Sequence, residues 1–544
     1  MTLLRKTVGE IVKEQARLQP THEAYIYPEH GIRKTYQEFD EETDTLAKAF
    51  IGMGIEKGEH VAIWSDNKPE WLLSQYATGK MGAVLVTVNT NYQATELEYL
   101  LKQSEATTLI LDESFKGTSY IDIIRTVCPE LITSEKGFIS SEKLPHFKRI
   151  ILMTEREVEG MYKWSEFITH ADKVTDEQFK QQFRSLDPDD VINIQYTSGT
   201  TGFPKGVMLT HNNVVNNGKQ IGDYMKLTGQ DRVCIPVPFF HCFGCVLGTL
   251  AAVTHGSAMI LLEQFDPLQV LKAVQEEKCT ALHGVPTMFI AELNHPDFTK
   301  YDTSSLRTGI MAGSVCPIEV MKRVIEDMGA SEITICYGQT ESSPVITQTK
   351  TDDPIGKRVS TVGKPHPNVE VKIIDPVTGE EMPVDVPGEL CTRGYHVMKG
   401  YYNNPEATRE VIDVEGWLHT GDIAVMDENG YIDITGRIKD MVIRGGENIY
   451  PKEVEEFLYT HPDISDVQVV GVPDVKYGEE LMAWIIPKEG VQLNEESVRE
   501  FCKGNISHHK VPKYIEFTNE YPMTASGKVQ KFKLREMSTE KSYQ

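Results

Sequence analysis

The residues with the clearest chemical potential lie at 196–207, a loop rich in hydroxyl, glycine and lysine side chains. Its glycines let the backbone turn sharply and point N–H groups at an anion, and Lys205 supplies a positive charge. It is not a Walker A loop, because Gly206 follows Lys205 where Ser or Thr is required. Composition alone leaves two possibilities equally open, a flexible surface turn and a loop that wraps nucleotide phosphates. The expected contacts are Thr197, Ser198, Gly199, Thr200, Thr201, Gly202, Phe203, Pro204 and Lys205.

This loop resembles, over twelve nearly unbroken positions, the signature of the adenylate-forming superfamily. That superfamily contains acyl-CoA synthetases, adenylation domains of peptide synthetases and luciferases. Further motifs of the family follow in its order, at 311–314, 337–341, 416–422, 436–451 and 522–528. The likeness is greatest to the acyl-CoA synthetase family member 2 group of medium-chain acyl-CoA synthetases, and it extends as far as Lys533.

The resemblance implies a magnesium and phosphate site. Glu341 would bind Mg²⁺ with Thr197, and Thr340 would face the adenylate phosphate. A carboxylate oxygen is the hard donor that Mg²⁺ prefers beside phosphate oxygens, although an isolated Thr-Glu pair would be interpreted as a helix cap. Lys528 would be the catalytic lysine of the adenylation step.

The same resemblance also predicts which residues bind the nucleoside. Asp422 would accept hydrogen bonds from the ribose hydroxyls, as suits an acceptor-only carboxylate, and Arg437 would be the second ribose contact. The small residues at 311–314 would let the flat adenine ring approach closely. The other implied nucleotide contacts are Gly313, Ser314, Tyr337 and Gly338.

The acid pocket is expected at 236–244. His241, Phe243 and Gly244 would line its entrance, with His241 gating the tunnel or contacting the acyl carboxylate. Relatives that activate amino acids carry an Asp in this segment; because this chain has none, the pocket suits an uncharged acyl tail. Cys242 and Cys245 lack the second ligand pair of a zinc site and are interpreted as small apolar residues of the pocket wall.

Lys439 occupies the hinge position of the family, and Gly445 and Gly446 resemble the glycines that face the pantetheine of coenzyme A in the second half-reaction. We therefore expect two domains, an AMP-binding domain at 1–436 and a mobile C-terminal domain at 437–544.

The elements that must position these residues alternate between helix and strand. Helices are predicted near 11–18, 40–54, 71–81 and 96–103, and strands at 60–64, 82–88 and 107–111. This alternation predicts a largely parallel α/β sheet, and a second α/β run is expected at 190–345. Short strands between Pro and Gly turns at 360–436 predict a small β-barrel or β-rich unit, and the C-terminal unit is predicted to be α+β.

The bulk composition excludes other classes. The chain has 544 residues, a formal net charge of -25 and nine Cys. The acidic balance disfavours nucleic acid and anionic membranes as partners, and scattered cysteines without a signal peptide predict a cytoplasmic protein. No stretch approaches the roughly 20 apolar residues of a transmembrane helix.

The sequence therefore predicts an ATP-dependent fatty acid–CoA ligase that uses Mg²⁺ and coenzyme A and passes through an acyl-adenylate. The alternatives are an enzyme that loads a carrier protein, a luciferase-like oxygenase, specificity for long chains, and a non-catalytic nucleotide-binding or acyl-binding module. Chain length and homo-oligomerisation stay open.

Overall fold

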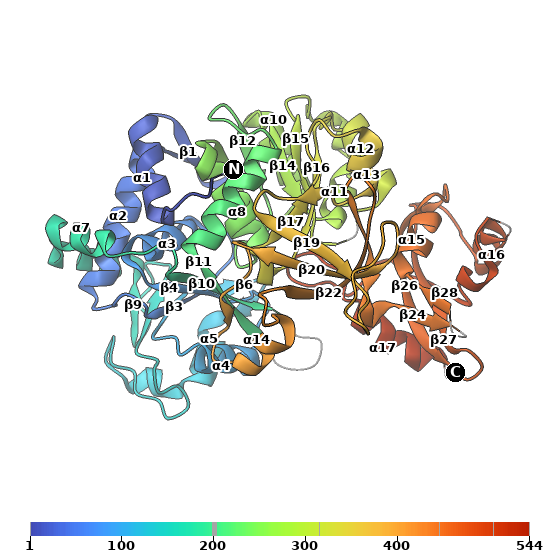
Figure 1. Cartoon of the computed structure of the whole chain (residues 1–544). Helices are drawn as coiled ribbons and strands as arrows, with labels where there is room; N and C mark the ends of the chain where they lie inside the picture. The colour runs from blue at the N-terminus through green and yellow to red at the C-terminus, as the bar shows by residue number, and fades with distance from the viewer. Residues whose placement is uncertain (1, 198–203, 315, 445–446, 504, 543–544) are drawn as a thin grey trace.

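The computed structural model describes residues 2–197, 204–314, 316–444, 447–503 and 505–542. Two α/β sheets and an antiparallel sheet form the large N-terminal part, and a smaller C-terminal unit lies at one end of the molecule (Figure 1). The described residues include no helix that is long and apolar enough to cross a bilayer.

The first sheet has eight strands in the order β21-β11-β10-β4-β3-β5-β8-β9. From β10 to β9 the neighbours are parallel, whereas β11 and β21 add antiparallel pairs at one edge. The strands are β3 (His60–Trp64), β4 (Val84–Thr87), β5 (Thr108–Leu111), β8 (Arg149–Leu152), β9 (Met161–Lys163), β10 (Val191–Thr197), β11 (Lys205–Thr210) and β21 (Gly400–Tyr401). The helices of this region include α1 (Val8–Leu18), α2 (Tyr36–Gly52), α3 (Pro69–Met81), α4 (Ala94–Gln103), α5 (Tyr120–Val127) and α7 (Asp176–Arg184).

The second sheet has nine strands in the order β18-β17-β16-β15-β14-β12-β13-β1-β2. Its strands are β1 (Glu23–Tyr27), β2 (Ile32–Thr35), β12 (Arg232–Ile235), β13 (Ala258–Leu261), β14 (Ala281–Gly284), β15 (Thr308–Met311), β16 (Thr334–Gly338), β17 (Val345–Gln348) and β18 (Lys364–Pro365). Its helices include α8 (His211–Tyr224), α9 (Ala251–His255), α10 (Pro267–Glu276), α11 (Pro286–Leu293), α12 (Ile318–Glu326) and α13 (Ile355–Ser360).

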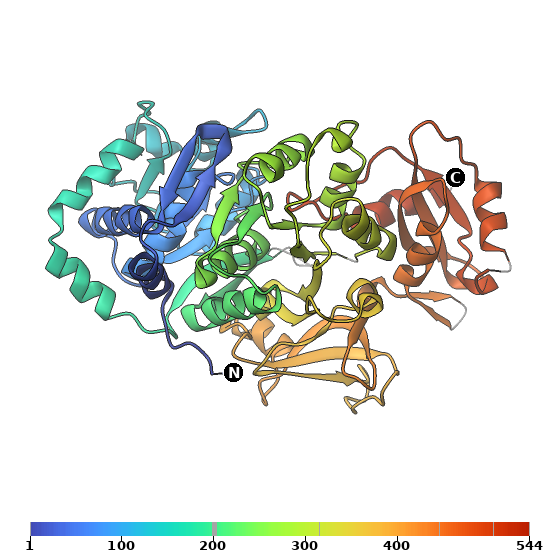
Figure 2. The ribbon, with the colours of Figure 1, turned by 90° about the horizontal axis from the view of Figure 1, so that it is seen from above.

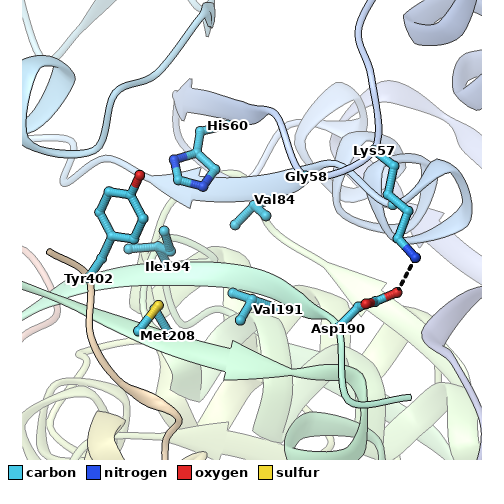
Figure 3. A pocket seen from close by; sticks show the side chains of 10 residues that line it. Lys57, Gly58, His60, Val84, Asp190, Val191, Ile194, Met208 and Tyr402 are labelled. Atoms are coloured by element: carbon cyan, nitrogen blue, oxygen red, sulfur yellow. Dashed lines mark ion pairs between the residues drawn. The ribbon is translucent and has the colours of Figure 1, made fainter. Parts of the chain in front are cut away.

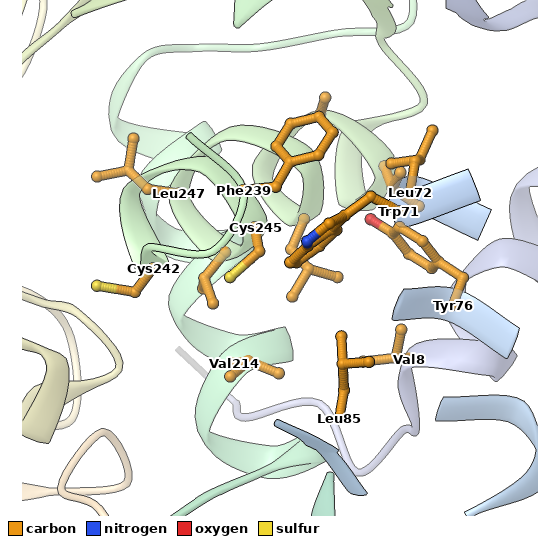
Figure 4. Packing of buried hydrophobic residues seen from close by; sticks show 14 of the residues in the cluster. Val8, Trp71, Leu72, Tyr76, Leu85, Val214, Phe239, Cys242, Cys245 and Leu247 are labelled. Carbon is orange, nitrogen blue, oxygen red and sulfur yellow. The ribbon is translucent and has the colours of Figure 1, made fainter. Parts of the chain in front are cut away.

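One apolar core joins the two α/β sheets. Trp71 and Tyr76 of α3 pack in it with Phe239 and with Val233 of β12, and all four side chains are fully or almost fully buried. Figure 4 shows Trp71 and Tyr76 facing the helix that carries Cys242 and Cys245. Because burying a large apolar side chain contributes about 1.5–3 kcal/mol, this shared core fixes the two sheets relative to each other.

The β-rich unit is an antiparallel sheet in the order β19-β20-β22-β23. Its strands are β19 (Val369–Ile374), β20 (Gly388–Gly394), β22 (Leu418–Met426) and β23 (Ile432–Arg437). Figure 2 shows this sheet in orange beside the α/β sheets, with the C-terminal unit in red beyond it.

The C-terminal unit is α+β, as predicted. Strands β26 (Ile464–Asp474) and β27 (Gly478–Pro487) form a long antiparallel pair, and β28 (Tyr514–Phe517) adds to β27 in parallel. The remaining elements are β24 (Val442–Arg444), β25 (Glu447–Ile449), α15 (Pro451–Tyr459), α16 (Glu495–Cys502) and α17 (Lys531–Ser542).

The structure corrects one expectation about sheet membership. The second α/β run was expected to begin at residue 190, yet β10 and β11 belong to the first sheet, where β10 pairs with β4. Conversely, β1, which comes from the N-terminal segment, belongs to the second sheet and pairs with β13. The predicted alternation was right, but the partner of each strand depends on packing between distant segments.

Candidate active site

The predicted phosphate loop is flanked by two paired strands. Strands β10 and β11 are antiparallel, and Thr197 lies opposite Lys205 in their register. Pro204 is held from the side, because Tyr99 Oη donates to its carbonyl at 3.1 Å. Six of the predicted contacts lie outside the described residues, namely Ser198, Gly199, Thr200, Thr201, Gly202 and Phe203.

Tyr401 of β21 connects this hairpin to the predicted metal ligand. Its hydroxyl donates to Glu341 Oε1 at 2.8 Å, and the ammonium of Lys205 lies 5.1 Å from its ring centroid. Sequence reasoning missed Tyr401, because it lies about 60 residues from Glu341 and carries no motif of its own. Tyr401 thus contacts both Lys205 and Glu341.

The motif at 337–341 ends β16 and enters a short 3-10 turn, η6 (Thr340–Ser342). The Thr340 side chain is buried, and its hydroxyl lies 3.7 Å from Cys242 Sγ. Gly338 is required by space, because a Cβ there would lie 1.8 Å from the carbonyl oxygen of Pro344. The Glu341 carboxylate is half-buried, so a hard anionic oxygen is available beside the phosphate hairpin, which fits a Mg²⁺ ligand.

Asp422 and Arg437 face each other across β22 and β23. They are register partners, with Arg437 Nε 3.2 Å from Asp422 Oδ1. Tyr337 Oη donates to the other carboxylate oxygen at 2.7 Å. Burial raises the pKa of Asp422, and the Arg437 guanidinium opposes that shift. The result is an oriented carboxylate that has an aromatic ring on one side and a cation on the other.

Lys528 reaches this site from the C-terminal unit. The hydroxyl of Thr287 donates to the carbonyl of Gly527 at 2.9 Å, and this bond docks the lysine loop on α11. A Cβ on Gly313 would lie 3.1 Å from Lys528 Cε, so the lysine stem runs along the loop after β15. Burial lowers the pKa of Lys528, as expected where a cation loses water. Ser314, beside Gly313, is exposed.

His241 begins the predicted acid pocket, and its tautomer follows from its partners. The backbone N–H of Phe243 donates to His241 Nδ1 at 3.1 Å, so Nδ1 is the acceptor and the proton resides on Nε2. Burial, together with the nearby Lys528 ammonium, lowers the pKa of His241 to about 3. His241 is therefore a neutral hydrogen-bond donor at physiological pH.

The segment predicted to form the pocket wall continues as a π-helix, η4 (Phe243–Leu250). Only glycine fits at Gly244, because a Cβ there would lie 2.3 Å from the carbonyl oxygen of Pro238. Cys242 and Cys245 are buried in the apolar core, which agrees with the prediction that they are small apolar residues (Figure 4). π-Helical segments are rare and often occur at functional sites.

Lys439, the predicted hinge residue, lies in the short turn η7 (Ile438–Asp440) directly after β23. Burial, with Arg437 nearby, lowers its pKa. Asp440, the next residue, forms an ion pair at 3.0 Å with Arg535 of α17. Gly445 and Gly446 lie outside the described residues.

A cavity of about 240 Å³ lies away from these residues, on the first sheet. Apolar side chains of β4, β10 and β11 line it, between an ion pair of Lys57 with Asp190 at 2.7 Å and the rings of His60 and Tyr402 (Figure 3). It contains none of the predicted site residues, so we assign it no part in the site.

The fold and the converging residues define an adenylate-forming enzyme, and comparison with known proteins supports this class. The AMP-binding enzyme family matches residues 12–402, and the AMP-binding enzyme C-terminal domain matches residues 453–528. The chain therefore belongs to the AMP-binding enzyme family, which confirms the superfamily predicted from the sequence.

Among relatives, the chain is 59% identical over 538 residues to YngI of Bacillus subtilis (strain 168), described as a candidate acyl-CoA synthetase; the match covers 99% of this chain and 98% of that protein. It is 42% identical to the mitochondrial medium-chain acyl-CoA ligase ACSF2 of Bos taurus, covering 98% and 88% of the two chains.

Solved structures of other adenylate-forming enzymes have a similar fold. The anthranilate CoA ligase AuaEII, in complex with anthranoyl-AMP, matches with a TM-score of 0.86 at 25% identity, over 100% of this chain and 99% of that one. ATP-bound MatB from Rhodopseudomonas palustris matches with a TM-score of 0.84 at 28% identity, over 98% and 99% of the chains.

Proposed function

We propose that this protein is an AMP-forming fatty acid–CoA ligase that acts on medium-chain acids. The observation that carries the proposal is the seating of Lys528 against Gly313, in the electrostatic environment of Asp422, Glu341 and His241. The names of YngI and of the medium-chain ligase ACSF2 support coenzyme A as acceptor and medium-chain acids as substrates.

In the first half-reaction the fatty carboxylate attacks the α-phosphate of ATP and expels pyrophosphate. An anion must approach a polyanion, so the site must offset negative charge as it redistributes. Lys528 is the cation next to that position, and the neutral His241 donates from Nε2 toward the acyl carboxylate. A general base is unnecessary, because the carboxylate is already ionised.

Asp422 and Arg437 hold the ribose, and Tyr337 orients the Asp422 carboxylate. The hairpin that ends at Thr197 and Lys205 holds the phosphates. Glu341 and Thr197 would hold Mg²⁺, which when bound neutralises phosphate charge. Thr340 faces the α-phosphate from the buried side of the site.

In the second half-reaction the thiol of coenzyme A attacks the acyl-adenylate and AMP leaves. We propose that the chain divides into domains at 1–436 and 437–544 and that the second rotates about Lys439 between the steps. Among the described residues, the polar contacts between the two parts include Lys452 with Asp433 at 2.5 Å and Thr287 with Gly527 at 2.9 Å, and a rigid-body rotation would break these. It would withdraw Lys528 and present Gly445 and Gly446 to the thiol.

The pocket residues favour an acid whose tail is uncharged. His241 is neutral, and Phe243 and Gly244 continue into the buried apolar wall of η4. All nine cysteines are free, which supports a reducing compartment, and we propose a cytoplasmic location.

The test is an assay of pyrophosphate, AMP and acyl-CoA with ATP, Mg²⁺ and coenzyme A across straight-chain acids of increasing length. Aryl acids and amino acids serve as controls. A maximum at medium chain length supports the proposal, and a maximum at long chains keeps the reaction but changes the specificity. Adenylate without thioester would identify another acceptor, such as a carrier protein. Absence of pyrophosphate with every acid would leave only a binding module.

A further inference from the structure

Three side chains with different metal-binding atoms converge on the antiparallel sheet, outside the nucleotide site. Glu389 and Cys391 lie on β20, and His419 lies opposite Cys391 on β22. Their ligand atoms all lie within 4.8 Å of one another. Glu389 and Cys391 are buried and His419 is partly exposed, so the cluster is reachable from solvent on one side.

Two of the distances match the edges of a tetrahedral zinc site. Zn–N, Zn–S and Zn–O bonds of the usual lengths place nitrogen roughly 3.6 Å from sulfur and roughly 3.4 Å from oxygen. In the structure, His419 Nδ1 lies 3.5 Å from Cys391 Sγ and 3.1 Å from Glu389 Oε2. The imidazole is therefore already placed against the other two ligands as a bound ion would require.

The other ring nitrogen of His419, Nε2, also has a neighbour that is typical of a zinc-binding histidine. Asp413 Oδ2 lies 3.7 Å from His419 Nε2, on the side of the ring away from the cluster. Histidines that bind zinc almost always present their other N–H to a carboxylate or carbonyl, which fixes the ring and raises its basicity. Asp413 is itself anchored, because its other oxygen accepts the backbone N–H groups of Glu415 and Trp417.

We propose that Glu389, Cys391 and His419 form a site for Zn²⁺, with water as the fourth ligand. Thiolate, imidazole and carboxylate together suit zinc rather than Mg²⁺, which prefers oxygen ligands alone. On binding, the Cys391 thiol loses its proton to solvent, and the imidazole proton resides on Nε2, facing Asp413. One proton leaves the protein for each ion that binds.

The site adjoins the predicted ribose site. The second oxygen of Glu389 accepts the backbone N–H of Gly421 at 3.0 Å, and Gly421 immediately precedes Asp422. An ion held by Glu389 therefore braces the turn that carries Asp422. With three protein ligands and an open position, the site suits a reversibly bound ion rather than a closed structural one.

The test titrates the metal-free full-length protein with Co²⁺ and follows thiolate-to-cobalt charge-transfer absorption, with Zn²⁺ as the displacing ion. We expect one Co²⁺ per chain, displacement by Zn²⁺ but not by Mg²⁺, and loss of the band in Cys391→Ser.

Two matched controls separate this site from general metal binding. Cys316→Ser removes another partly buried thiol, and His30→Gln disrupts the exposed cluster with Glu29 and Glu263; both should keep the band. A band that survives Cys391→Ser, or that is absent from the unchanged protein, would overturn the proposal.

Asp413→Asn provides a second variant in case Cys391→Ser does not fold. Because Asp413 does not touch the ion, the band should persist while affinity falls about 10- to 100-fold. Unchanged affinity in this variant would overturn the assigned arrangement. Circular dichroism of each variant establishes that it is folded before titration.

Discussion

Gly313 and Lys528 lie in contact: a Cβ on Gly313 would stand 3.1 Å from Lys528 Cε and 3.1 Å from Val285 Cγ1. The φ of Gly313 is +94°, which disfavours any side chain at this position. The two residues come from different units of the chain, so their contact measures how closely the C-terminal loop is seated on the site.

Gly313→Ala should therefore lower the rate of adenylation, by about 100-fold if the added methyl displaces the lysine by about 1 Å. Pyrophosphate release with a medium-chain acid measures the effect. Gly356→Ala is the control, because a Cβ there has open space. Equal rates in both variants would show that Lys528 does not need the contact.

Lys528→Ala should lower adenylation by about 100- to 1,000-fold, because a preorganised charge is removed from the transition state. Thiolysis of supplied acyl-adenylate should persist, since the lysine is withdrawn in that step. Lys533→Ala, at an exposed position in the same segment, is the matched control. Equal loss of both half-reactions would contradict the role of Lys528.

Tyr337→Phe should raise the KM for ATP about tenfold, because Asp422 loses a hydrogen bond that contributes up to about 1.5 kcal/mol. Tyr431→Phe removes a similar bond, from Tyr431 Oη to Asp353 at 2.8 Å, outside the site. The KM of this control should not change. A similar rise in both variants would show a general effect on folding instead.

Lys439→Pro should impair thiolysis more than adenylation, because proline fixes φ at the point where the backbone is proposed to rotate. Lys439→Ala, which keeps the backbone free, should affect the two steps far less. Rates of the separate half-reactions provide the comparison. A proline variant with normal thiolysis would place the hinge elsewhere.

Acid should destabilise the fold through buried histidines. Burial lowers the pKa of His283 to about 3, against about 6.5 when unfolded, and neither ring nitrogen has a hydrogen-bond partner among the described residues. The stability that depends on neutral His283 is complete above about pH 6.5 and falls as the pH drops toward 3, because the unfolded chain binds the extra proton.

Between roughly pH 6 and pH 4, His283 makes the free energy of unfolding fall by about 1.4 kcal/mol per pH unit, and His283→Phe should abolish this contribution. Thermal unfolding of both proteins at pH 7.5 and pH 4.5 measures it, and the melting temperature of the variant should fall less. Parallel curves would mean that His283 gains a partner or a proton in the folded protein.

Several elements were predictable because local pattern suffices for them. The strand at 60–64 has the predicted bounds, and the strands expected at 82–88 and 107–111 are present at 84–87 and 108–111, since each is a short apolar run between turns. The helix expected near 40–54 begins and ends earlier, at Tyr36 and Gly52. Helix ends depend on capping and on the packing of the last turn, which periodicity does not encode.

Tyr401 shows what local pattern cannot provide. Its hydrogen bond to Glu341 exists only because β21 adds to the edge of β11, far from it in sequence. The cluster of Glu389, Cys391 and His419 arises in the same way, from the register of β20 with β22. The local sequence of these strands does not specify which strands pair or in which register, because an antiparallel edge can pair in many registers until core packing favours one.

The sequence by itself determined the chemistry. The phosphate loop and the motifs around Glu341, Asp422 and Lys528 contain the required donors and charges in their own residue types, and the helix and strand periods lie in neighbouring side chains. The tertiary structure alone decided which strands pair, that His241 is neutral with its proton on Nε2, and that Lys528 lies against Gly313. Those properties depend on burial and on distances between residues far apart in the chain, which are fixed only when the shared core has packed.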